Sequence, residues 1–411
     1  MRILSAAGLA GAMFAFSGAA APEFVLPERL YAAPGRECSV YFKSVFSSVT
    51  PENYAYEAES KKGRAYAERW CWTPTAEDAG SRTELVLRAW TDEGCASVFT
   101  ATVEVASAPR NPGKTVRTAL FADSLTNSSY QNELFRVLRA DGFAGYVPVG
   151  SRKSKLAGGV RHDGYGGYDC KAFLEYYAVT EDEVERVQDA AEREQLLSLG
   201  VPVKVVKEWQ RELLKSPLVG FSGGRKKVDI AGWIARASDG VAPDVVIVQL
   251  GVNSVFGRRG GASEIRDDIR KRVIPQFKAF LATLREHMPK AVFGISTQPL
   301  GCSQDGFAAN YGARAGEVQH RVTMFVLNRE IERFVLSLGD PLVELVPLAH
   351  CVDPATGYPR KSVAANARTQ ETLLRSVNAL HPTLSGGCQM ADAIASWFEC
   401  RWNSWELSKS P

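Results

Sequence analysis

The chain has 411 residues, of which 45% are apolar and 23% charged, and it carries a formal net charge of +3. A chain of this length exceeds one typical hydrophobic core, so two domains are expected. The small net charge and the lack of a dense basic patch with interleaved aromatic residues argue against a nucleic-acid-binding protein. No low-complexity tract interrupts the composition, which is that of a globular protein.

The first residues have the pattern of a secretory signal peptide. Arg2 precedes a short apolar stretch, and the small residues 18–21 follow it, so cleavage is expected near Ala20 or Ala21. The apolar stretch is shorter than the roughly 20 residues that a membrane anchor needs. We therefore expect residues 1–21 to direct export, a secreted or periplasmic location, and no stable membrane span in the mature chain.

Cysteine content points to the same compartment. Eight cysteines fit an oxidising environment, although their pairing cannot be read from the spacing. Cys388 and Cys400 are excluded as partners of each other, because we expect them on one helix about 18 Å apart. No Cys/His cluster has the spacing of a zinc site, and we expect neither a metal nor an organic cofactor.

Residues 22–108 have the texture of β-structure. Aromatic and β-branched residues alternate with Pro and Gly, and residues 83–106 read as two strands about a short turn at 92–94. No helical periodicity competes. These features predict a small all-β domain, an immunoglobulin-like sandwich. Residues 109–115, rich in Pro and Gly, follow as a linker.

From residue 116 the pattern changes to alternating strands and helices. The helical stretches separate five apolar runs that we expect to be strands: 116–121, 145–150, 244–251, 291–297 and 341–348. This alternation predicts an α/β domain over residues 116–405 with a doubly wound parallel five-stranded sheet.

A long insertion, residues 171–243, separates the second and third expected strands. It begins with a charged amphipathic helix at 180–200 and continues with an expected loop at 215–234. Connections of this length act as lids or specificity elements, or they are passive surface elaborations. Both interpretations stay open.

Four short blocks carry residues suited to nucleophilic chemistry. Ser124 follows the first strand of the α/β domain, where it is either a nucleophile or simply a helix N-cap. A Gly-rich turn lies within residues 162–174 and can offer a backbone N–H to an anion. Asn253 stands just beyond a buried strand, where its amide can donate to an oxyanion. His381 precedes Pro382 and the last helix, on a loop that the proline makes rigid.

In this order and spacing the four blocks resemble the SGNH (GDSL-type) hydrolase family, over about residues 116–402. The resemblance implies a flavodoxin-like sheet and acyl transfer from an ester. It also implies that Ser124 is the nucleophile and His381 the general base. The three oxyanion donors that it implies are the backbone N–H groups of Ser124 and Gly167 and the side chain of Asn253. Gly167 is preferred over Gly166 because the family's glycine precedes the residue that opens the helix, here Tyr168.

The chain departs from the family's pattern at three positions. Ala122 replaces the glycine before Asp123, and Ser254 replaces the aspartate that often follows the asparagine. The third departure is the serious one, because Asn378 stands where the family has the aspartate that orients the histidine. An asparagine can accept the imidazole N–H, but it cannot stabilise imidazolium by charge.

Three interpretations of this departure remain. Asn378 itself orients His381, and the Ser-His pair is slow. Alternatively, another acid supplies the charge, with Asp353 the first candidate and Glu371 the second. In the third interpretation the site binds its ligand without turning it over.

The resemblance also bears on the substrate. Secreted family members with an accessory β-module often remove acetyl or other acyl groups from carbohydrates, which implies a carbohydrate esterase, with lipid or aryl esters as alternatives. Tyr165, Tyr168 and Trp233 are candidates to stack on sugar rings, or they are core residues. The rival from another class is a catalytically silent carbohydrate-binding or adhesion protein in which the sandwich does the binding.

Overall fold

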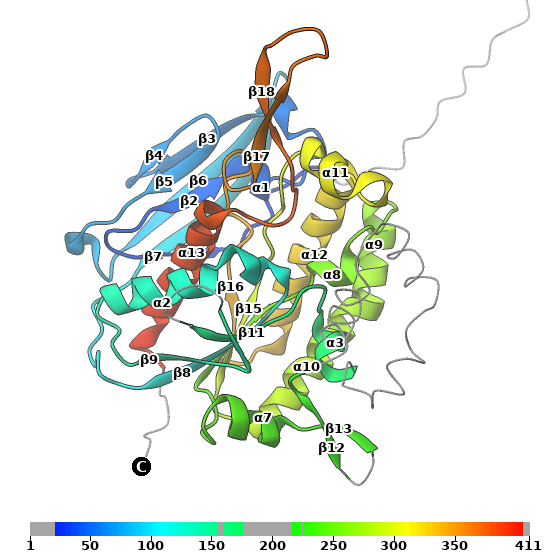
Figure 1. Ribbon diagram of the computed structural model, residues 1–411. Coiled ribbons are helices and arrows are strands. Elements are labelled where there is room, and N and C mark those ends of the chain that lie inside the picture. Colours follow the sequence, from blue (N-terminus) through cyan, green and yellow to red (C-terminus); the bar gives the residue numbers. More distant parts are fainter. Residues whose placement is uncertain (1–20, 155–158, 176–215, 223–224, 406–411) are drawn as a thin grey trace, which may run out of the picture.

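The structure is a computed structural model that describes residues 21–154, 159–175, 216–222 and 225–405. The predicted signal peptide, the charged stretch at 180–200 and most of the insertion lie outside the described residues. Figure 1 shows an all-β module packed against an α/β body, with a two-stranded arm that projects from the body.

The N-terminal module consists of two sheets. A four-stranded sheet has the order β1-β7-β6-β3, and a three-stranded sheet has the order β2-β5-β4. The bounds are β1 (Arg29–Ala32), β2 (Cys38–Tyr41), α1 (Phe42–Val45), η1 (Pro51–Asn53), β3 (Ala55–Ser60), β4 (Arg64–Ala65), β5 (Arg69–Trp72), η2 (Ala76–Asp78), β6 (Arg82–Thr91) and β7 (Gly94–Val105). The turn expected at 92–94 joins β6 to β7, which pair in antiparallel register.

Both sheets contribute to one hydrophobic cluster. Leu85, Leu87 and Val103 from the larger sheet join Val40 and Trp70 from the smaller one. Burial along β6 alternates with the two-residue period of a strand that has one face in a core. The immunoglobulin-like topology of this module and the domain boundaries stay predictions.

The α/β body is built on the five expected strands. They all pair in parallel, in the spatial order second, first, third, fourth, fifth, which is the order of flavodoxin-like sheets. Their bounds are β8 (Val116–Ala122), β9 (Tyr146–Val149), β14 (Val245–Gln249), β15 (Val292–Ser296) and β16 (Val343–Val346).

Helices cover both faces of this sheet (Figure 1). Along β14, Val246 and Val248 pack into one hydrophobic cluster, and Val245 and Ile247 pack into the other. On the first face lie α3 (Cys170–Glu175), α7 (Ile230–Ala237), α9 (Ala262–Asp268), η4 (Ile269–Val273), α10 (Ile274–His287) and α12 (Glu317–Leu338). On the second lie α2 (Tyr130–Ala140) and α13 (Leu384–Trp402). This two-sided burial explains why the strands read as continuous apolar runs.

The sheet is larger than the predicted five strands. β11 (Arg161–Gly164) pairs in parallel with the end of β8, on the edge that β9 occupies further back, and β10 (Arg152–Lys153) pairs with β11. Sequence patterning missed both strands because each is short and β11, with the sequence RHDG, is polar. The sheet therefore has seven strands, and the prediction of five was wrong in number.

The described end of the insertion also differs from the expected loop. It contains the antiparallel hairpin of β12 (Val219–Ser222) and β13 (Arg225–Val228), followed by α7. Trp233 of α7 is fully buried and donates its indole N–H to the carboxylate of Asp163 at 3.0 Å. This part of the insertion is therefore packed into the α/β core.

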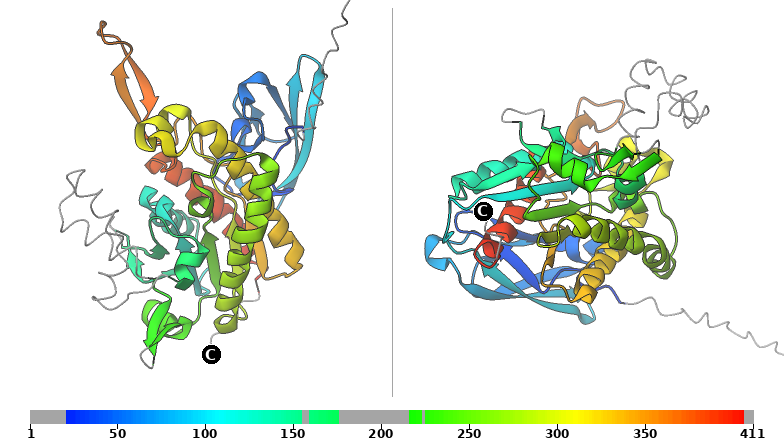
Figure 2. Two further views of the ribbon diagram at one scale, coloured as in Figure 1. Left: turned by 90° about the vertical axis from the view of Figure 1, so that its right-hand side faces the viewer. Right: turned by 90° about the horizontal axis from the view of Figure 1, so that it is seen from below.

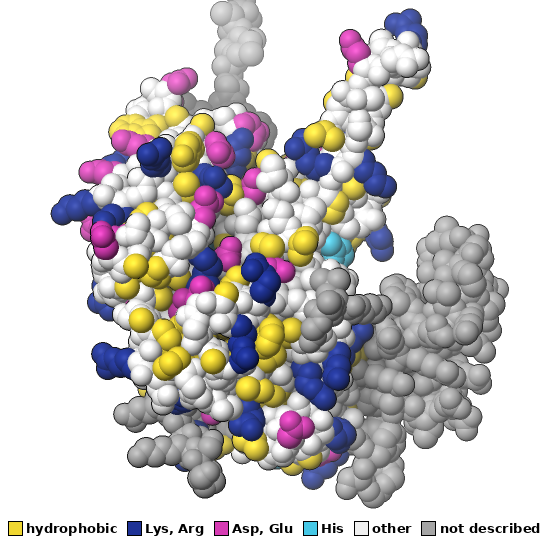
Figure 3. All heavy atoms as spheres, turned by 60° about the vertical axis from the view of Figure 1, so that its left-hand side comes forward, with side chains coloured by type: hydrophobic (Ala, Val, Ile, Leu, Met, Phe, Trp, Pro, Cys, Tyr) yellow, Lys and Arg dark blue, Asp and Glu magenta, His cyan; other side chains and the backbone are white. Residues whose placement is uncertain are grey.

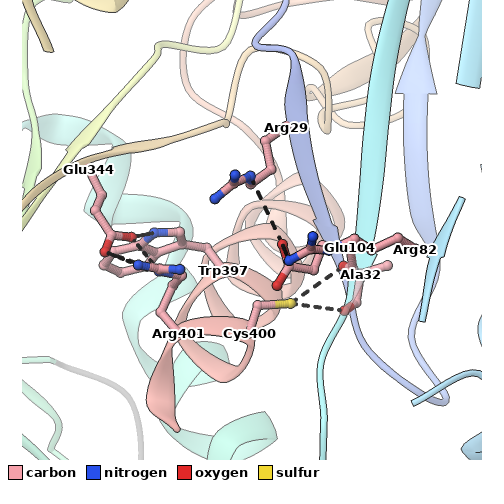
Figure 4. Close-up of polar contacts among 8 residues, drawn as sticks. All are labelled: Arg29, Ala32, Arg82, Glu104, Glu344, Trp397, Cys400 and Arg401. Carbon is pink, nitrogen blue, oxygen red and sulfur yellow. Dashed lines mark hydrogen bonds and ion pairs between the residues drawn. The ribbon is translucent and has the colours of Figure 1, made fainter. Parts of the chain in front are cut away.

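Helix α13 links the body to the module (Figure 4). Arg401 of α13 binds both carboxylate oxygens of Glu344 at 2.9–3.0 Å, and Trp397 donates to the same carboxylate. The thiol of Cys400 contacts the backbone carbonyls of Ala32 in β1 and Glu104 in β7. The last helix is thus held between the sheet of the body and the sheet of the module.

The cysteines do not support the compartment that their number suggested. All eight are free thiols in the structure, and Cys388 and Cys400 lie on the same helix, α13, as expected. Cysteine usage therefore gives no support to an oxidising environment, and the N-terminal pattern is the remaining argument for export. Among the described residues no helix is both long and apolar enough to span a membrane.

Arg321 of α12 anchors the module from the other side. Its buried guanidinium donates to the backbone carbonyls of Lys43, Phe46 and Ser48. Arg321→Met leaves these acceptors without a donor, and we expect it to lower the free energy of unfolding by about 2–4 kcal/mol in urea denaturation. Arg333→Met, which removes a half-exposed ion pair, should cost at most about 1 kcal/mol. Equal losses would contradict the anchoring role.

Candidate active site

Ser124 stands directly behind the carboxyl end of β8. This strand is almost completely buried, and Asp123 ends it by capping the short helix η3 (Ser124–Ser128). The Asp123 carboxylate accepts the backbone N–H of Leu125 at 2.9 Å. Asp123 is therefore the N-cap, and the interpretation of Ser124 as a simple N-cap is wrong. The hydroxyl of Ser124 is left for another contact.

The Gly-rich turn lies beside this serine. Tyr165 donates its backbone N–H to the carbonyl of Ala122 at 3.0 Å, which ties the turn to the end of β8. A side chain on Gly166 would bring its Cβ to 3.9 Å from that of Ser124. Gly167 has a φ of 79°, a left-handed conformation that favours glycine. The turn therefore lies within van der Waals reach of Ser124, and its conformation at Gly167 is one that favours glycine.

Asn253 is braced against the same turn. It lies in α8 (Val252–Val255), just beyond β14, and its amide donates to the backbone carbonyl of Tyr168 at 2.9 Å. The next residue, Ser254, donates to the carboxylate of Asp169 at 3.1 Å. Because the amide nitrogen carries two hydrogens, one of them stays available to a ligand. Ser254, in the family's aspartate position, thus holds the two loops together.

His381 lies in the loop between β18 (Thr372–Ser376) and α13. Thr383 closes this loop as the N-cap of α13. The Nε2 atom of His381 is 2.8 Å from the Oγ atom of Ser124, although 257 positions separate the two residues in the chain. The structure therefore brings the predicted nucleophile and the predicted base into hydrogen-bond contact.

The other ring nitrogen of His381, Nδ1, faces the amide nitrogen of Asn378 and not its carbonyl oxygen. The carbonyl oxygen of Asn378 already accepts the backbone N–H groups of Leu380 and His381, each at 3.0 Å. The amide nitrogen therefore turns toward Nδ1, at 3.2 Å. An amide nitrogen donates and does not accept, so Asn378 does not accept the Nδ1 proton as the sequence had suggested.

Tyr311 supplies the oxygen that Asn378 does not present. Its hydroxyl lies 3.4 Å from Nδ1 of His381 and 3.3 Å from the carbonyl oxygen of Asn378. It stands between α11 (Gln304–Asn310) and η5 (Gly312–Arg314), where its ring packs on Phe256. Sequence reasoning missed this residue because a single tyrosine after a short helix belongs to no motif.

These atoms allow two hydrogen-bond arrangements. In the first, Nδ1 of His381 accepts from the amide of Asn378, and Nε2 carries a proton that points at Ser124. In the second, Nδ1 carries the proton and donates to the hydroxyl of Tyr311, which donates in turn to Asn378, while the amide N–H of Asn378, 3.2 Å from Nδ1, faces another donor. Only the second leaves Nε2 free to accept the proton of Ser124.

Burial controls the charge state of the site. It lowers the pKa of His381 from its ordinary value, and no carboxylate of the described residues opposes this shift. Burial also raises the pKa of Asp123 to about 7, against the hydrogen bond from Leu125. Burial therefore favours the neutral imidazole, which is the form that a proton acceptor needs.

Neither substitute acid reaches the histidine. The carboxylate of Asp353 accepts hydrogen bonds within its own turn, from the backbone N–H of Ala355 at 2.8 Å and from the hydroxyl of Thr356 at 2.5 Å. Glu371 lies in the exposed turn between β17 (Arg360–Ala364) and β18. In the part of the chain that the structure describes, neither side chain contacts His381, so both suggestions were wrong.

The aromatic candidates for sugar stacking are core residues in two cases out of three. Trp233 and Tyr168 are almost fully buried. The ring of Tyr165 is half-buried, stacks on Tyr168 at 4.8 Å and is covered by the guanidinium of Arg152. Core packing is therefore the main role of these rings. Within the described ranges no cluster of His, Cys, Asp and Glu suits a metal ion.

Comparisons with known proteins give weak likenesses. No family model matches the chain, and no curated protein matches it. Among solved structures, a possible lipase from Chitinophaga pinensis is 14% identical, with 69% of this chain and 97% of that chain covered and a TM-score of 0.36. The acetyl xylan esterase AlAXEase is 13% identical, with 69% and 99% covered and a TM-score of 0.30.

A lipase/acylhydrolase from Enterococcus faecalis is similar to the same degree: 14% identity, 72% and 100% coverage and a TM-score of 0.31. These neighbours are lipases, acylhydrolases and an esterase by description. At such TM-scores they carry no argument for this chain. The function therefore has to be argued from the geometry of the site.

Asn378→Asp tests the electrostatics of the site directly. A carboxylate beside Nδ1 favours the imidazolium, so we expect the pKa of His381 to rise above its wild-type value. NMR titration of the His381 ring signals measures this change and separates it from the titration of Asp123. Asn378→Leu, which removes the amide without adding charge, is the control. An unchanged pKa in Asn378→Asp would mean that position 378 does not face the ring.

Proposed function

We propose that this protein is a serine ester hydrolase of the SGNH type. The proposal rests on one observation above the others: the contact of 2.8 Å between Oγ of Ser124 and Nε2 of His381. A hydroxyl held against a neutral, half-buried imidazole is the arrangement that nucleophilic catalysis needs. The Gly-rich turn and Asn253 beside it add donors for a negative charge.

The reaction follows from these positions. His381 takes the proton of Ser124 as the oxygen attacks the ester carbonyl, and the carbonyl oxygen becomes an oxyanion. The backbone N–H groups of Ser124 and Gly167 and the second amide hydrogen of Asn253 donate to that oxyanion. The imidazolium returns the proton to the leaving alcohol, and water activated by His381 then releases the acyl group.

Tyr311 acts as the positioning residue in this mechanism. It accepts the Nδ1 proton of His381 and so favours the tautomer in which Nε2 is a base, against the amide of Asn378, which favours the other tautomer. Because a neutral hydroxyl stabilises imidazolium less than a carboxylate does, the site is slower than one with aspartate at 378. Replacement of the aspartate by asparagine in a serine triad costs as much as about 10⁴ in kcat, mainly through the wrong tautomer. Tyr311 offsets part of that loss.

We infer acylated carbohydrates, acetylated polysaccharides in particular, as the substrate class, and export as the route by which the protein meets them. Support for export comes from the pattern of residues 1–21. Support for a polymeric substrate comes from the open position of Gly166 and Gly167, which are exposed at the mouth of the site. The β-module is proposed as an accessory domain for the polymer.

A catalytically silent carbohydrate-binding protein is the second candidate, and Asn378 is the observation that favours it. The two candidates differ in a single measurement. We expect the wild-type protein to hydrolyse p-nitrophenyl acetate and Ser124→Ala to lose about 10³-fold or more of kcat. Thr126→Ser, a nearby hydroxyl outside the reacting set, is the control. Equal rates for wild type and Ser124→Ala would end the hydrolase proposal.

The role of Tyr311 has its own test in a double-mutant cycle. Tyr311→Phe removes the acceptor for Nδ1, and we expect kcat to fall roughly tenfold, about 1.4 kcal/mol of barrier. In the Asn378→Asp background the carboxylate takes over that task, so Tyr311→Phe should have little further effect. A loss of the same size in both backgrounds would show that Tyr311 only supports the fold.

A further inference from the structure

A two-stranded arm, residues 360–376, projects from the body (Figures 1 and 2). It leads into the loop that carries His381. Among the strands that the structure describes, β17 and β18 pair only with each other. Their residues are exposed along both faces, apart from partly buried Val363 and Ser376. The arm therefore has no core of its own and no sheet to extend.

The stability of such an arm requires an explanation. Isolated two-stranded hairpins are marginally stable in water, because they bury little apolar surface. This one leaves Leu374 59% exposed and Leu373 36% exposed. Its outer strand edges also present unpaired backbone groups. A ligand that covers the arm would stabilise it.

The charge of the arm indicates the sign of that ligand. The arm contains four cationic side chains and a single carboxylate, that of Glu371, so its net charge is +3. That equals the net charge of the whole chain, which is otherwise balanced. Figure 3 shows dark blue Lys and Arg side chains at the tip and at the base of the arm. The four cations are Arg360, Lys361, Arg368 and Arg375.

The register of the hairpin places two of these cations opposite each other. Lys361 lies directly opposite Arg375 in the antiparallel pair, and Val363 lies opposite Leu373 on the same face. Like charges in a cross-strand pair destabilise a hairpin. Arg375 reaches Asp305 of α11 at 3.4 Å, whereas no ion pair of Lys361 is present among the described residues. An anion beside this pair would relieve the repulsion.

The base of the arm adjoins the catalytic histidine. The backbone N–H of Val377 donates to the carbonyl of Pro359 at 2.9 Å and closes the base. Six residues separate Arg375 from His381, a span of at most about 20 Å even in extended chain. The base of the arm is therefore within about 20 Å along the chain of the histidine that contacts Ser124.

We propose that the arm is a docking site for an acidic polysaccharide, a glycan whose uronic acid carboxylates pair with Arg360 on one face, Lys361 on the other and Arg368 at the tip, while its acyl groups are presented to Ser124. This inference rests on the proposed function, because it names the class of polymer that the esterase site would take. The arm has no aromatic residue on which neutral sugars or nucleic-acid bases would stack. Leu373 and Leu374 are adjacent in a strand and point to opposite faces, so the arm offers no continuous apolar face to a membrane.

Binding can be measured without catalysis. In the Ser124→Ala protein, we expect isothermal titration with polygalacturonate to show binding that weakens as NaCl rises from 20 to about 300 mM, since exposed charges are screened. The triple variant Arg360→Gln, Lys361→Gln, Arg368→Gln should lose about tenfold in affinity. The matched control, Lys61→Gln, Arg64→Gln, Lys290→Gln, removes the same charge from exposed sites elsewhere and should bind as the parent does.

Kinetic measurements then show which substrates depend on the arm. In the otherwise wild-type chain, the arm triple variant should lose about tenfold in kcat/KM on acetylated polygalacturonate at low salt, with acetylated xylan and p-nitrophenyl acetate changed less than twofold. Hydrolysis of p-nitrophenyl acetate also shows that the variant is folded. Equal binding by the two triple variants would overturn the proposal.

Arm-dependent binding to phosphatidylglycerol vesicles or to single-stranded DNA, without binding to polygalacturonate, would overturn it too. Failure of the esterase proposal has a different result, equal p-nitrophenyl acetate rates for wild type and Ser124→Ala.

Discussion

The hydrogen bond between Ser124 and His381 depends on the parallel arrangement of the central sheet. Because all five main strands run in one direction, their carboxyl ends share one edge, and the loops after β8 and β14 open there together. His381 reaches the same edge from a loop that precedes α13. That helix is held by Glu344 of β16 and by the carbonyls of the β-module. The module therefore supports the helix behind the histidine loop.

The unusual chemistry of the site lies in how its imidazole is oriented. A carboxylate would both select the tautomer and stabilise the imidazolium, but this chain has an amide whose carbonyl oxygen is already occupied by two backbone N–H groups. The hydroxyl of Tyr311 can select the tautomer only. Burial meanwhile lowers the pKa of His381, which favours the neutral base and makes the imidazolium more costly to form.

Much of this arrangement could be predicted from the sequence, because it is local. The five main strands are continuous apolar runs, and Ser124, Asn253 and His381 each follow or precede a recognisable element. Tyr311 could not be predicted, because its proximity to His381 depends on how α11 packs. The same holds for the burial of Trp233 and for β11, whose polar residues become a strand only because the end of β8 offers an unpaired edge. The atom that Asn378 turns toward the ring is likewise set by two backbone groups and not by residue type.

The account depends most on Ser124 being a nucleophile activated by His381. Intact-protein and peptide mass spectrometry after treatment with a fluorophosphonate tests this directly, because such reagents phosphonylate only an activated serine. The account predicts one adduct, on the peptide that carries Ser124, and its loss in His381→Ala. An adduct on another residue, or labelling of Ser124 at the same rate without His381, would contradict it.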